Sequence, residues 1–291
     1  MPIKDQLQFL LVCPWCFSER LDYSNNSIQC CKCTLRLPVS DQGVIDCVLP
    51  ESKDQELFDF YNTEYIKRYP TLDIQDASWK AETVLALLKE TKIKPRRLLD
   101  LGCGNGEVLK LVDEGIHPEI AVGVDISSSN LNYALQGSGQ FTFIQAAVEH
   151  LPFRTGSFDL GLVIDLVEHL EDPKAGLLEA GRVCDYLVVK VPLEDCFEGW
   201  LLKKVLPDWK DRFGHINFFN EQTVKEILLN DDQVELISEK LLYTPWCLLG
   251  FDHAPFRSKA LILARYLMRG LGRRTFSKIH PLWYVALLRT S

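Results

Sequence analysis

The sequence predicts an α/β protein in which a small zinc-binding module precedes a parallel, doubly wound sheet. Two Cys-x-x-Cys pairs lie within the first 50 residues. From residue 78 onward, short apolar runs alternate with amphipathic segments, and a glycine-rich turn follows the first of these runs. Strands that alternate with helices form a parallel sheet with helices on both faces, so this pattern defines the fold class.

The composition excludes several other classes of protein. The chain has 291 residues, 47% hydrophobic and 25% charged, so it is neither disordered nor a disulfide-stapled miniprotein. No window approaches the roughly 18 apolar residues of a membrane span, and the first residues lack a signal-peptide pattern. We therefore expect a cytoplasmic protein without a transmembrane segment. A formal net charge of −8 argues against a general nucleic-acid binder.

The two cysteine pairs predict a structural zinc site. Cys13 and Cys16 form the first pair, Cys30 and Cys33 form the second, and 13 residues separate the pairs. Four thiolates in two such pairs can close a tetrahedron around Zn²⁺. Residues 21–29 are expected to form a strand, an Asn-Asn turn and a second strand, which returns the second pair to the first.

Two further cysteines and the charge of the same segment bear on its role. Cys31 adjoins a predicted ligand, but the two-residue spacing before Cys33 favours Cys30, and Cys47 lies outside both pairs and is expected to be packed. Residues 1–50 contain four basic and five acidic residues, whereas a phosphate-binding surface should be basic. We interpret the segment as a structural module or a partner-binding surface.

The alternating pattern begins with a helix that starts from a Ser78 cap and is stopped by Pro95. The fourth apolar run is almost continuously hydrophobic, as expected of a strand buried on both faces. The predicted strands are 98–101, 120–127, 141–147, 157–166, 185–192, 233–243 and 281–289. The predicted helices are 78–91, the segment after the glycine-rich turn, 127–137, 172–183 and 219–231.

The glycine-rich turn is Gly102-Cys-Gly104-Asn-Gly106. Glycine allows positive φ and a close approach of ligand to backbone, and the following helix presents its N–H groups there. Asp125 ends the second strand, where a carboxylate can accept both hydroxyls of a ribose. Glu107 follows the turn and would repel a pyrophosphate, whereas a cationic sulfonium cofactor has no such conflict.

These motifs resemble those of the class I S-adenosylmethionine (SAM) methyltransferases. The segments LLDLGCGNGEVL, VGVDIS and EHLPFRTGSFDLGLVIDLVEHLEDP carry the resemblance. It covers roughly residues 78–245 and is closest to the methyltransferase type 11 group, which includes the ubiquinone and menaquinone methyltransferases. The resemblance implies a Rossmann-like, seven-stranded methyltransferase sheet. The expected domains are a zinc ribbon (1–50), a linker or cap segment (51–77) and a methyltransferase domain (78–291).

The cysteine-rich segment is similar to a second family. The stretch LVCPWCFSERLDYSNNSIQCCKCTLRLPVSDQGVIDCVLP resembles small zinc-ribbon domains. Such domains occur alone as activating subunits of tRNA and rRNA methyltransferases, or are fused ahead of other methyltransferases. The resemblance implies Zn²⁺ as a second, structural cofactor.

The methyltransferase resemblance implies a SAM site. Asp100 would order the methionine ammonium, Asp125 would hold the ribose hydroxyls and Ile126 would pack on adenine. The family usually has Asp where this chain has Ala147, which removes a charged hydrogen bond of about 1.5–3 kcal/mol to the adenine amino group. Backbone N–H groups near Val148 would still form hydrogen bonds with the adenine ring. The other expected cofactor contacts are Gly102, Gly104, Gly106 and Asp165.

Candidate catalytic residues lie after the fourth and fifth strands. SAM is already activated, so positioning supplies much of the catalysis, whereas a carbon acid needs a base. Three candidates lie at the end of the fourth strand: Asp165, Glu168 and His169. The alternative for His169 is that it packs against the sheet and takes no part in catalysis. His215 lies in a later loop, where in related quinone O-methyltransferases a His lies near the acceptor; helix capping or loop packing is its alternative. Asn217 is a helper candidate.

Two inserts, 193–219 and 244–281, are expected to shape the acceptor pocket. The first insert carries Trp200 and Trp209, which we interpret as packing residues of an accessory helix. The alternative is that these tryptophans stack on a base.

The second insert contains an amphipathic segment, residues 258–271. Arg265, Arg269 and Arg273 follow one another at helical spacing there, and the chain from Ala254 onward holds eight basic residues and no acidic one. A basic amphipathic helix can contact anionic lipid or receive a phosphorylated substrate. We expect peripheral membrane contact through residues 257–278, with an ordinary solvated face as the alternative.

Three functions stay open at this level. The first is methylation of a small-molecule, glycan or lipid-linked acceptor, including anionic ones, which the branch resemblance and the apolar and basic insert favour. The second is methylation of rRNA or tRNA, gripped by the ribbon and the basic tail. The acidic ribbon and the missing Asn/Asp-Pro-Pro-Tyr/Phe motif argue against it. The third is a non-catalytic scaffold or regulatory subunit that keeps the fold.

Overall fold

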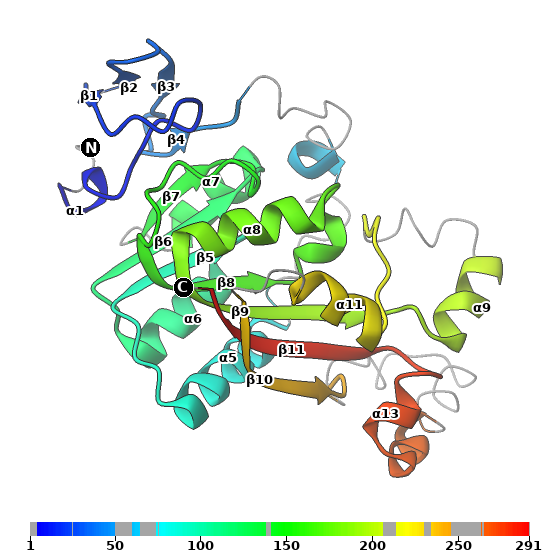
Figure 1. Ribbon diagram of the computed structural model, residues 1–291. Helices are drawn as coiled ribbons and strands as arrows, with labels where there is room; N and C mark the ends of the chain where they lie inside the picture. Colours follow the sequence, from blue (N-terminus) through cyan, green and yellow to red (C-terminus); the bar gives the residue numbers. More distant parts are fainter. Residues whose placement is uncertain are drawn as a thin grey trace. The chain divides into compact units, whose positions relative to one another are not determined.

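The computed structural model describes residues 5–24, 26–49, 60–64, 74, 76–137, 141–205, 214–229, 234–245, 263 and 265–290 (Figure 1). The chain divides into two compact units. The first contains residues 1–163, 175–187 and 290–291, and the second contains residues 164–174 and 188–289. None of the described helices is both long enough and apolar enough to cross a membrane.

The first unit is built on a parallel sheet whose strands alternate with helices. Within this unit the strand order is β8-β5-β6-β7-β4, with the fold's first long strand, β5, inside the sheet. The strands are β5 (Arg97–Leu101), β6 (Ile120–Asp125), β7 (Thr142–Gln145) and β8 (Phe158–Ile164), and the helices are α5 (Ala77–Thr91), α6 (Glu107–Ile116), α7 (Ser128–Gly137) and α8 (Pro173–Val183). This is the Rossmann-like α/β architecture that the alternating pattern predicts.

Two helices of the first unit begin at different kinds of cap. Ser127 caps α7, because the N–H of Asn130 donates to its Oγ at 3.2 Å. The predicted Ser78 cap of α5 is wrong. That helix already begins at Ala77 with Asp76 at the N-cap, so Ser78 lies inside the first turn. α5 packs on α6, where a Cβ added to Gly115 would lie 2.6 Å from Leu85 Cδ2, so a larger residue there would displace the Leu85 side chain.

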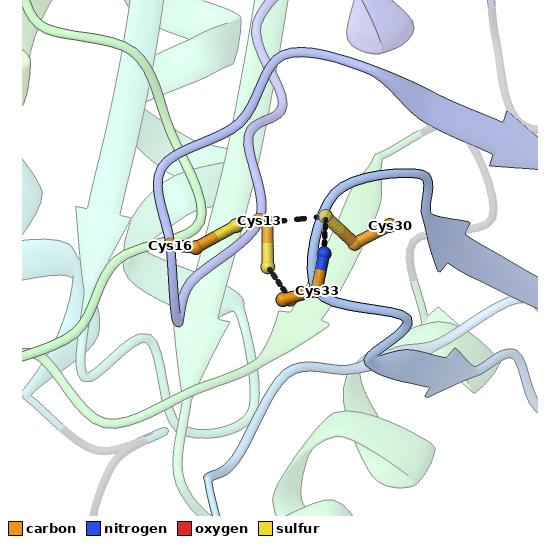
Figure 2. Close-up of side chains that lie close together, drawn as sticks. All are labelled: Cys13, Cys16, Cys30 and Cys33. Carbon is orange, nitrogen blue, oxygen red and sulfur yellow. Dashed lines mark hydrogen bonds between the residues drawn. The ribbon is translucent and has the colours of Figure 1, made fainter.

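The cysteine-rich segment folds as part of the first unit. β1 (Leu21–Tyr23), β2 (Ser27–Cys30) and β3 (Arg36–Pro38) form an antiparallel sheet after the short helix α1 (Asp5–Gln8). The predicted hairpin over 21–29 is therefore present, and its two cysteine pairs face each other (Figure 2).

This ribbon is joined to the central sheet at two places, which the sequence pattern did not predict. β4 (Ile45–Asp46) pairs in parallel with β7, which adds a strand to the sheet. Leu11 forms an isolated bridge with Phe153, and the N–H of Val12 donates to the Pro152 carbonyl at 2.9 Å. The ribbon thus shares main-chain hydrogen bonds with the α/β sheet.

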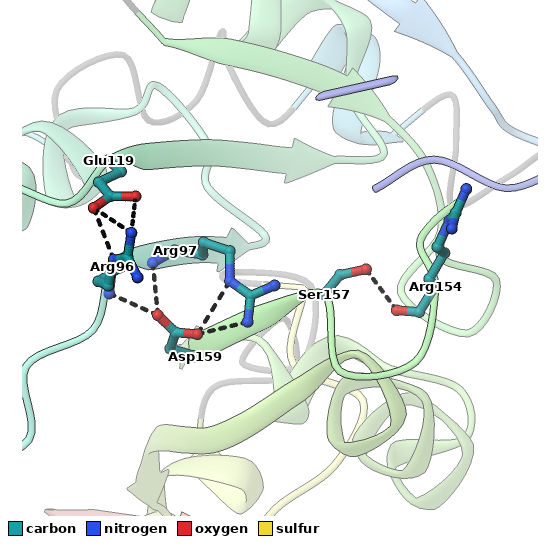
Figure 3. A network of polar contacts seen from close by, with 6 residues as sticks. All are labelled: Arg96, Arg97, Glu119, Arg154, Ser157 and Asp159. Atoms are coloured by element: carbon teal, nitrogen blue, oxygen red, sulfur yellow. Dashed lines mark hydrogen bonds and ion pairs between the residues drawn. The ribbon is translucent and has the colours of Figure 1, made fainter. Parts of the chain in front are cut away.

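Ion pairs join the amino-terminal ends of neighbouring strands in the first unit (Figure 3). The Arg97 guanidinium donates to Asp159 Oδ1 from Nη2 at 2.7 Å, and the backbone N–H groups of Arg96 and Arg97 donate to Oδ2 of the same carboxylate. Arg96 also pairs with Glu119 at 2.7 Å. Asp159 therefore ties the start of β5 to β8, at the end of the sheet opposite the glycine-rich turn.

The second unit contains the end of β9 (Cys184–Leu193), β10 (Glu235–Leu242) and β11 (Leu282–Arg289), in the order β10-β11-β9. β10 and β11 are antiparallel, which departs from the all-parallel expectation. Parallel neighbours need a crossover between them, and adjacent strands without one run antiparallel. The helical segments are η3 (Val167–His169), α9 (Phe197–Val205), α11 (Glu221–Leu228), η6 (Arg269–Leu271) and α13 (Arg273–Phe276).

Candidate cofactor and acceptor sites

The glycine-rich turn has the strained backbone that its sequence predicts. Gly102, Gly104 and Gly106 have φ of 70°, 52° and 77°, in the left-handed region that favours glycine. A Cβ on Gly106 would also lie 3.2 Å from Phe143 Cζ. α6 begins immediately after the turn, so its amino-terminal end faces this end of the sheet.

Asp125 holds this turn against the end of β6. Its Oδ2 accepts the N–H of Gly104 at 2.8 Å, and its Oδ1 accepts the N–H of Ser127 at 2.8 Å. The carboxylate is nearly buried, at 8% exposure. One side chain therefore joins the two loops that follow β5 and β6.

Asp100 is a buried acid without a hydrogen-bond donor on Oδ2 among the described residues. Burial, reinforced by the negative charge of Asp125, raises the pKa of Asp100 to about 8, although Lys80 opposes the shift. A cation bound beside this side chain would lower its pKa again.

The expected adenine contacts lie at the ends of β6 and β7. Ala147 and Val148 follow β7 and are buried, at 7% exposure each, whereas Ile126 is partly exposed. The Ile126 carbonyl accepts Gln145 Nε2 at 3.0 Å. The structure thus groups Ile126, Ala147 and Val148 in one unit with Asp125, and their contacts with a cofactor stay predictions.

The segment predicted as a linker or cap contributes a turn of helix to the first unit. η2 (Phe60–Glu64) lies at the start of α7, where Ser127 Oγ donates to the Tyr61 carbonyl at 3.1 Å. Ser128 Oγ donates to Asn62 Oδ1 at 3.0 Å. Sequence reasoning missed this contact; the run of three serines at 127–129 was the available signal.

In the second unit, η3 and a later loop bring a carboxylate and two imidazoles together. The rings of His169 and His215 have centroids 4.8 Å apart. The backbone N–H groups of Ile216 and Asn217 both donate to the Glu168 carbonyl at 3.0 Å, which locks the loop to η3. The helper candidate Asn217 uses its side chain structurally, donating to the Leu170 carbonyl at 2.6 Å.

The pKa values of titratable groups in this cluster are shifted from their usual values. Burial, and next the charge of Asp165, raises the pKa of Glu168 to about 8. Burial lowers the pKa of His215, but the hydrogen bond and charge of Glu194 raise it more, so the net shift is upward. His215 Nδ1 lies 2.7 Å from Glu194 Oε2. Glu194 was not among the predicted residues, because only folding brings it to His215.

Asp165 also belongs to the second unit, while the other expected cofactor contacts belong to the first. Its φ is 54°, and its Oδ1 accepts Lys190 Nζ at 2.7 Å. Lys190 is fully buried, with Nζ 3.2 Å from the Trp283 ring centroid. Asp165 thus neutralises a buried ammonium, and this partner was also missed because Lys190 lies within an apolar strand pattern.

The cysteine pairs form the arrangement expected of a metal site. One Sγ from each of Cys13, Cys16, Cys30 and Cys33 lies within 4.8 Å of the others. Cys13 Sγ is 3.5 Å from Cys33 Sγ, and the N–H of Cys33 points at Cys30 Sγ (Figure 2). Four converging thiols fit the donor set of structural Zn²⁺. Cys31 is exposed and outside the group, and Cys47 is packed in the core, as predicted.

The basic residues of the second insert are arranged differently from the single helical face that we expected. Arg265 pairs with Glu198, and Arg269 Nη2 donates to the Thr244 carbonyl at 2.7 Å. Gly272, with φ of 84°, then ends the helical run, so Arg273 belongs to a separate helix, α13. The prediction of one face formed by Arg265, Arg269 and Arg273 is therefore wrong. Residues 258–262 and 264 of the predicted helix 258–271 lie outside the described residues.

The aromatic residues of the first insert are partly described. Trp200 is on α9, is half exposed and stacks on Phe197, with ring centroids 5.8 Å apart. The accessory helix is present, but Trp200 does not pack into the core. Trp209 lies outside the described residues.

Part of this chain matches known methyltransferases. Residues 99–185 match the family described as a methyltransferase domain. Malonyl-[acyl-carrier protein] O-methyltransferase of Legionella pneumophila subsp. pneumophila is 38% identical over 76 residues, which are 25% of this chain and 27% of that protein. The ubiquinone/menaquinone biosynthesis C-methyltransferase UbiE of Rhizobium johnstonii is 26% identical over 174 residues, 52% of this chain and 67% of that protein. The chain therefore spans only part of the length of these curated relatives.

A solved structure shows the same fold. Magnesium protoporphyrin IX methyltransferase from Synechocystis PCC 6803 superimposes with a TM-score of 0.55 at 15% identity, over 81% of this chain and all of that one. The chain therefore has the fold of the class I methyltransferases. More narrowly, residues 99–185 of this chain carry the methyltransferase domain shared with its relatives.

Proposed function

We propose that this chain transfers the methyl group of SAM to a small-molecule, glycan or lipid-linked acceptor. The observation that carries the proposal is the Asp125 carboxylate, which accepts the N–H groups of Gly104 and Ser127 together. A carboxylate at the end of the second strand can accept the hydroxyls of a ribose. The curated relatives, named for malonyl-[acyl-carrier protein] and for ubiquinone/menaquinone biosynthesis, support an acceptor of this kind.

The remaining cofactor contacts follow from the same end of the sheet. Gly102, Gly104 and Gly106 would let the methionine and ribose approach the main chain, and Ile126, Ala147 and Val148 would surround the adenine. Asp100 would hold the methionine ammonium, which gives its buried carboxyl a cationic partner.

Binding of SAM is therefore expected to become tighter as the pH rises. Between about pH 6 and pH 7.5 the dissociation constant should fall by up to tenfold per pH unit, because Asp100, with a pKa of about 8, must lose its proton to pair with the ammonium. Titration calorimetry in buffers of different ionisation enthalpy measures both the constant and the proton released. Asp100→Asn should flatten this dependence. A wild-type affinity that does not change with pH would contradict the assignment.

The acceptor chemistry is assigned to the second unit. Positioning in line with the activated methyl group supplies much of the rate, and Asp165, His169 and His215 are the candidates for removing a proton from the acceptor. Glu194 at His215 Nδ1 orients the ring and stabilises its protonated form.

The exposed surface of the second insert supports a lipid-linked acceptor and peripheral membrane contact. Leu263, Tyr266, Leu267 and Leu271 are all exposed, and Leu267 is 71% accessible. The exposed cations Arg273, Arg274 and Lys278 follow in the chain. Apolar side chains beside cations suit a surface that contacts anionic lipid.

Methyl transfer from radiolabelled SAM into a fractionated extract of the source organism tests the acceptor class. Label is expected in the organic or small-molecule fraction, and Asp125→Ala should reduce it at least tenfold when SAM is limiting. Label that ribonuclease releases would replace this proposal with the rRNA or tRNA alternative. Absence of label in every fraction, with SAM binding shown, would favour the non-catalytic alternative.

A further inference from the structure

The cluster after β8 has the composition of a metal site that the proposed function does not require. One potential ligand atom from each of Glu168, His169 and His215 lies within 4.8 Å of the others. All three residues belong to the second unit. Metal–nitrogen and metal–oxygen bonds of about 2.1 Å place neighbouring donors roughly 3 Å apart, so small side-chain rotations close such a group around one ion.

Glu168 supplies an independent observation. The residue is 1% exposed, and neither carboxylate oxygen has a hydrogen-bond partner within the part of the chain that the structure describes. A buried polar group without a partner is costly, so buried carboxylates are normally paired or bound to a cation. A cation between Glu168 and the two imidazoles satisfies this group.

Both imidazoles are held in the way that metal-binding histidines are held. His169 Nδ1 lies 3.1 Å from the Gly214 carbonyl, and His215 Nδ1 lies 2.7 Å from Glu194 Oε2. Because an oxygen lies at each Nδ1, the proton of each imidazole is on Nδ1 and the lone pair is on Nε2. Metal-binding histidines usually donate their other ring N–H to an oxygen in this way.

The charge of the cluster matches a divalent ion. Asp165, Glu168 and Glu194 carry three negative charges when ionised, and Lys190, paired with Asp165, carries one positive charge. With neutral imidazoles the balance is −2. The main-chain hydrogen bonds from Ile216 and Asn217 to Glu168 hold the loop in place before any ion binds.

We propose that Glu168, His169 and His215 bind one divalent transition-metal ion. Two imidazoles and one carboxylate are a donor set for Fe²⁺, Mn²⁺, Co²⁺ or Zn²⁺, and three protein ligands leave positions open for oxygen atoms of a ligand. Such an ion lowers the pKa of a hydroxyl group that binds to it, so the hydroxyl loses its proton more easily. His215 then binds the metal through its lone pair and does not act as the base. Metal binding itself needs neither SAM nor methyl transfer.

Titration of the 291-residue chain with MnCl₂, followed by electron paramagnetic resonance of free Mn²⁺, tests this proposal. Mn²⁺ prefers oxygen and nitrogen donors to thiolates, so the cysteine site does not interfere. The wild type is expected to bind about one Mn²⁺ per chain, and Glu168→Gln and His215→Gln should each weaken binding at least tenfold. Glu194→Gln should cost about 10-fold to 100-fold through the orientation of His215.

Matched variants outside the cluster should bind Mn²⁺ like the wild type: Glu226→Gln, an exposed glutamate, and His117→Asn, at the end of α6. Thermal melts monitor folding, and Mn²⁺ should raise the melting temperature of the wild type but not of the ligand variants. If Glu168→Gln fails to fold, His215→Gln and the wild-type melting shift decide the question. Wild-type protein that binds no Mn²⁺, or ligand variants that bind it equally well, would overturn the proposal.

Discussion

Replacing Asp125 with alanine is expected to weaken SAM binding at least tenfold and up to about 10³-fold. A charge-assisted hydrogen bond contributes about 1.5–3 kcal/mol, and under the proposed function the carboxylate accepts two ribose hydroxyls. The substitution also removes the acceptor of the Gly104 and Ser127 N–H groups. The turn that receives the cofactor should loosen, and the free energy of unfolding should fall by about 1–3 kcal/mol.

Calorimetric titration with SAM measures the first effect, and denaturant unfolding measures the second. Asp22→Ala, which changes an exposed aspartate on β1, is the matched control and should leave SAM affinity unchanged. Asp125→Asn keeps the shape and one acceptor, so its affinity should fall between those of the wild type and Asp125→Ala. An unchanged affinity in Asp125→Ala would remove Asp125 from the cofactor site.

Loss of the proposed zinc site is expected to have the largest effect on stability. We propose that Cys13, Cys16, Cys30 and Cys33 hold one Zn²⁺, and structural zinc contributes about 10–16 kcal/mol to the folding of small zinc-binding domains. Cys13→Ser should therefore lower the zinc content by about one ion per chain and unfold the ribbon. Because β4 pairs with β7 and Val12 bonds to Pro152, the melting temperature of the whole first unit should fall as well.

Cys31→Ser is a sharp control for this experiment, because Cys31 adjoins the ligand Cys30 but is exposed. Its zinc content and melting temperature should equal those of the wild type. Elemental analysis of purified protein measures the zinc, and calorimetry measures the melting temperature. Finding no zinc in the wild type, or the same loss in Cys31→Ser as in Cys13→Ser, would refute the assignment.

The parts of the fold that could be predicted are those with local causes. The strand and helix segments follow from hydrophobic periodicity, and the left-handed turn at Gly102, Gly104 and Gly106 follows from the residues themselves. The cysteine pairs could be predicted because tetrahedral thiolate binding needs this spacing. The Ser78 cap failed because propensity alone sets a helix start only to within a residue or two.

The candidate site could be predicted only where its residues lie near strand ends. Asp165, His169 and His215 are together, as loops after parallel strands allow. Glu194 and Lys190 were not predicted as their partners, because a hydrogen bond between residues 21 or 25 positions apart leaves no periodic trace. The inward turn of Arg265 and Arg269 was missed for the same reason.

By itself, the sequence determined the fold class of this protein, an α/β fold with a cysteine-rich segment before it, since glycine turns, strand-end acids and cysteine spacing act over a few residues. Only the tertiary structure decided that the ribbon shares a sheet with this domain through β4, and that the buried Glu168 lies close to two imidazoles. It also decided that Asp100 has a raised pKa. Burial and charge proximity arise when distant segments pack, so these properties exist only in the folded chain.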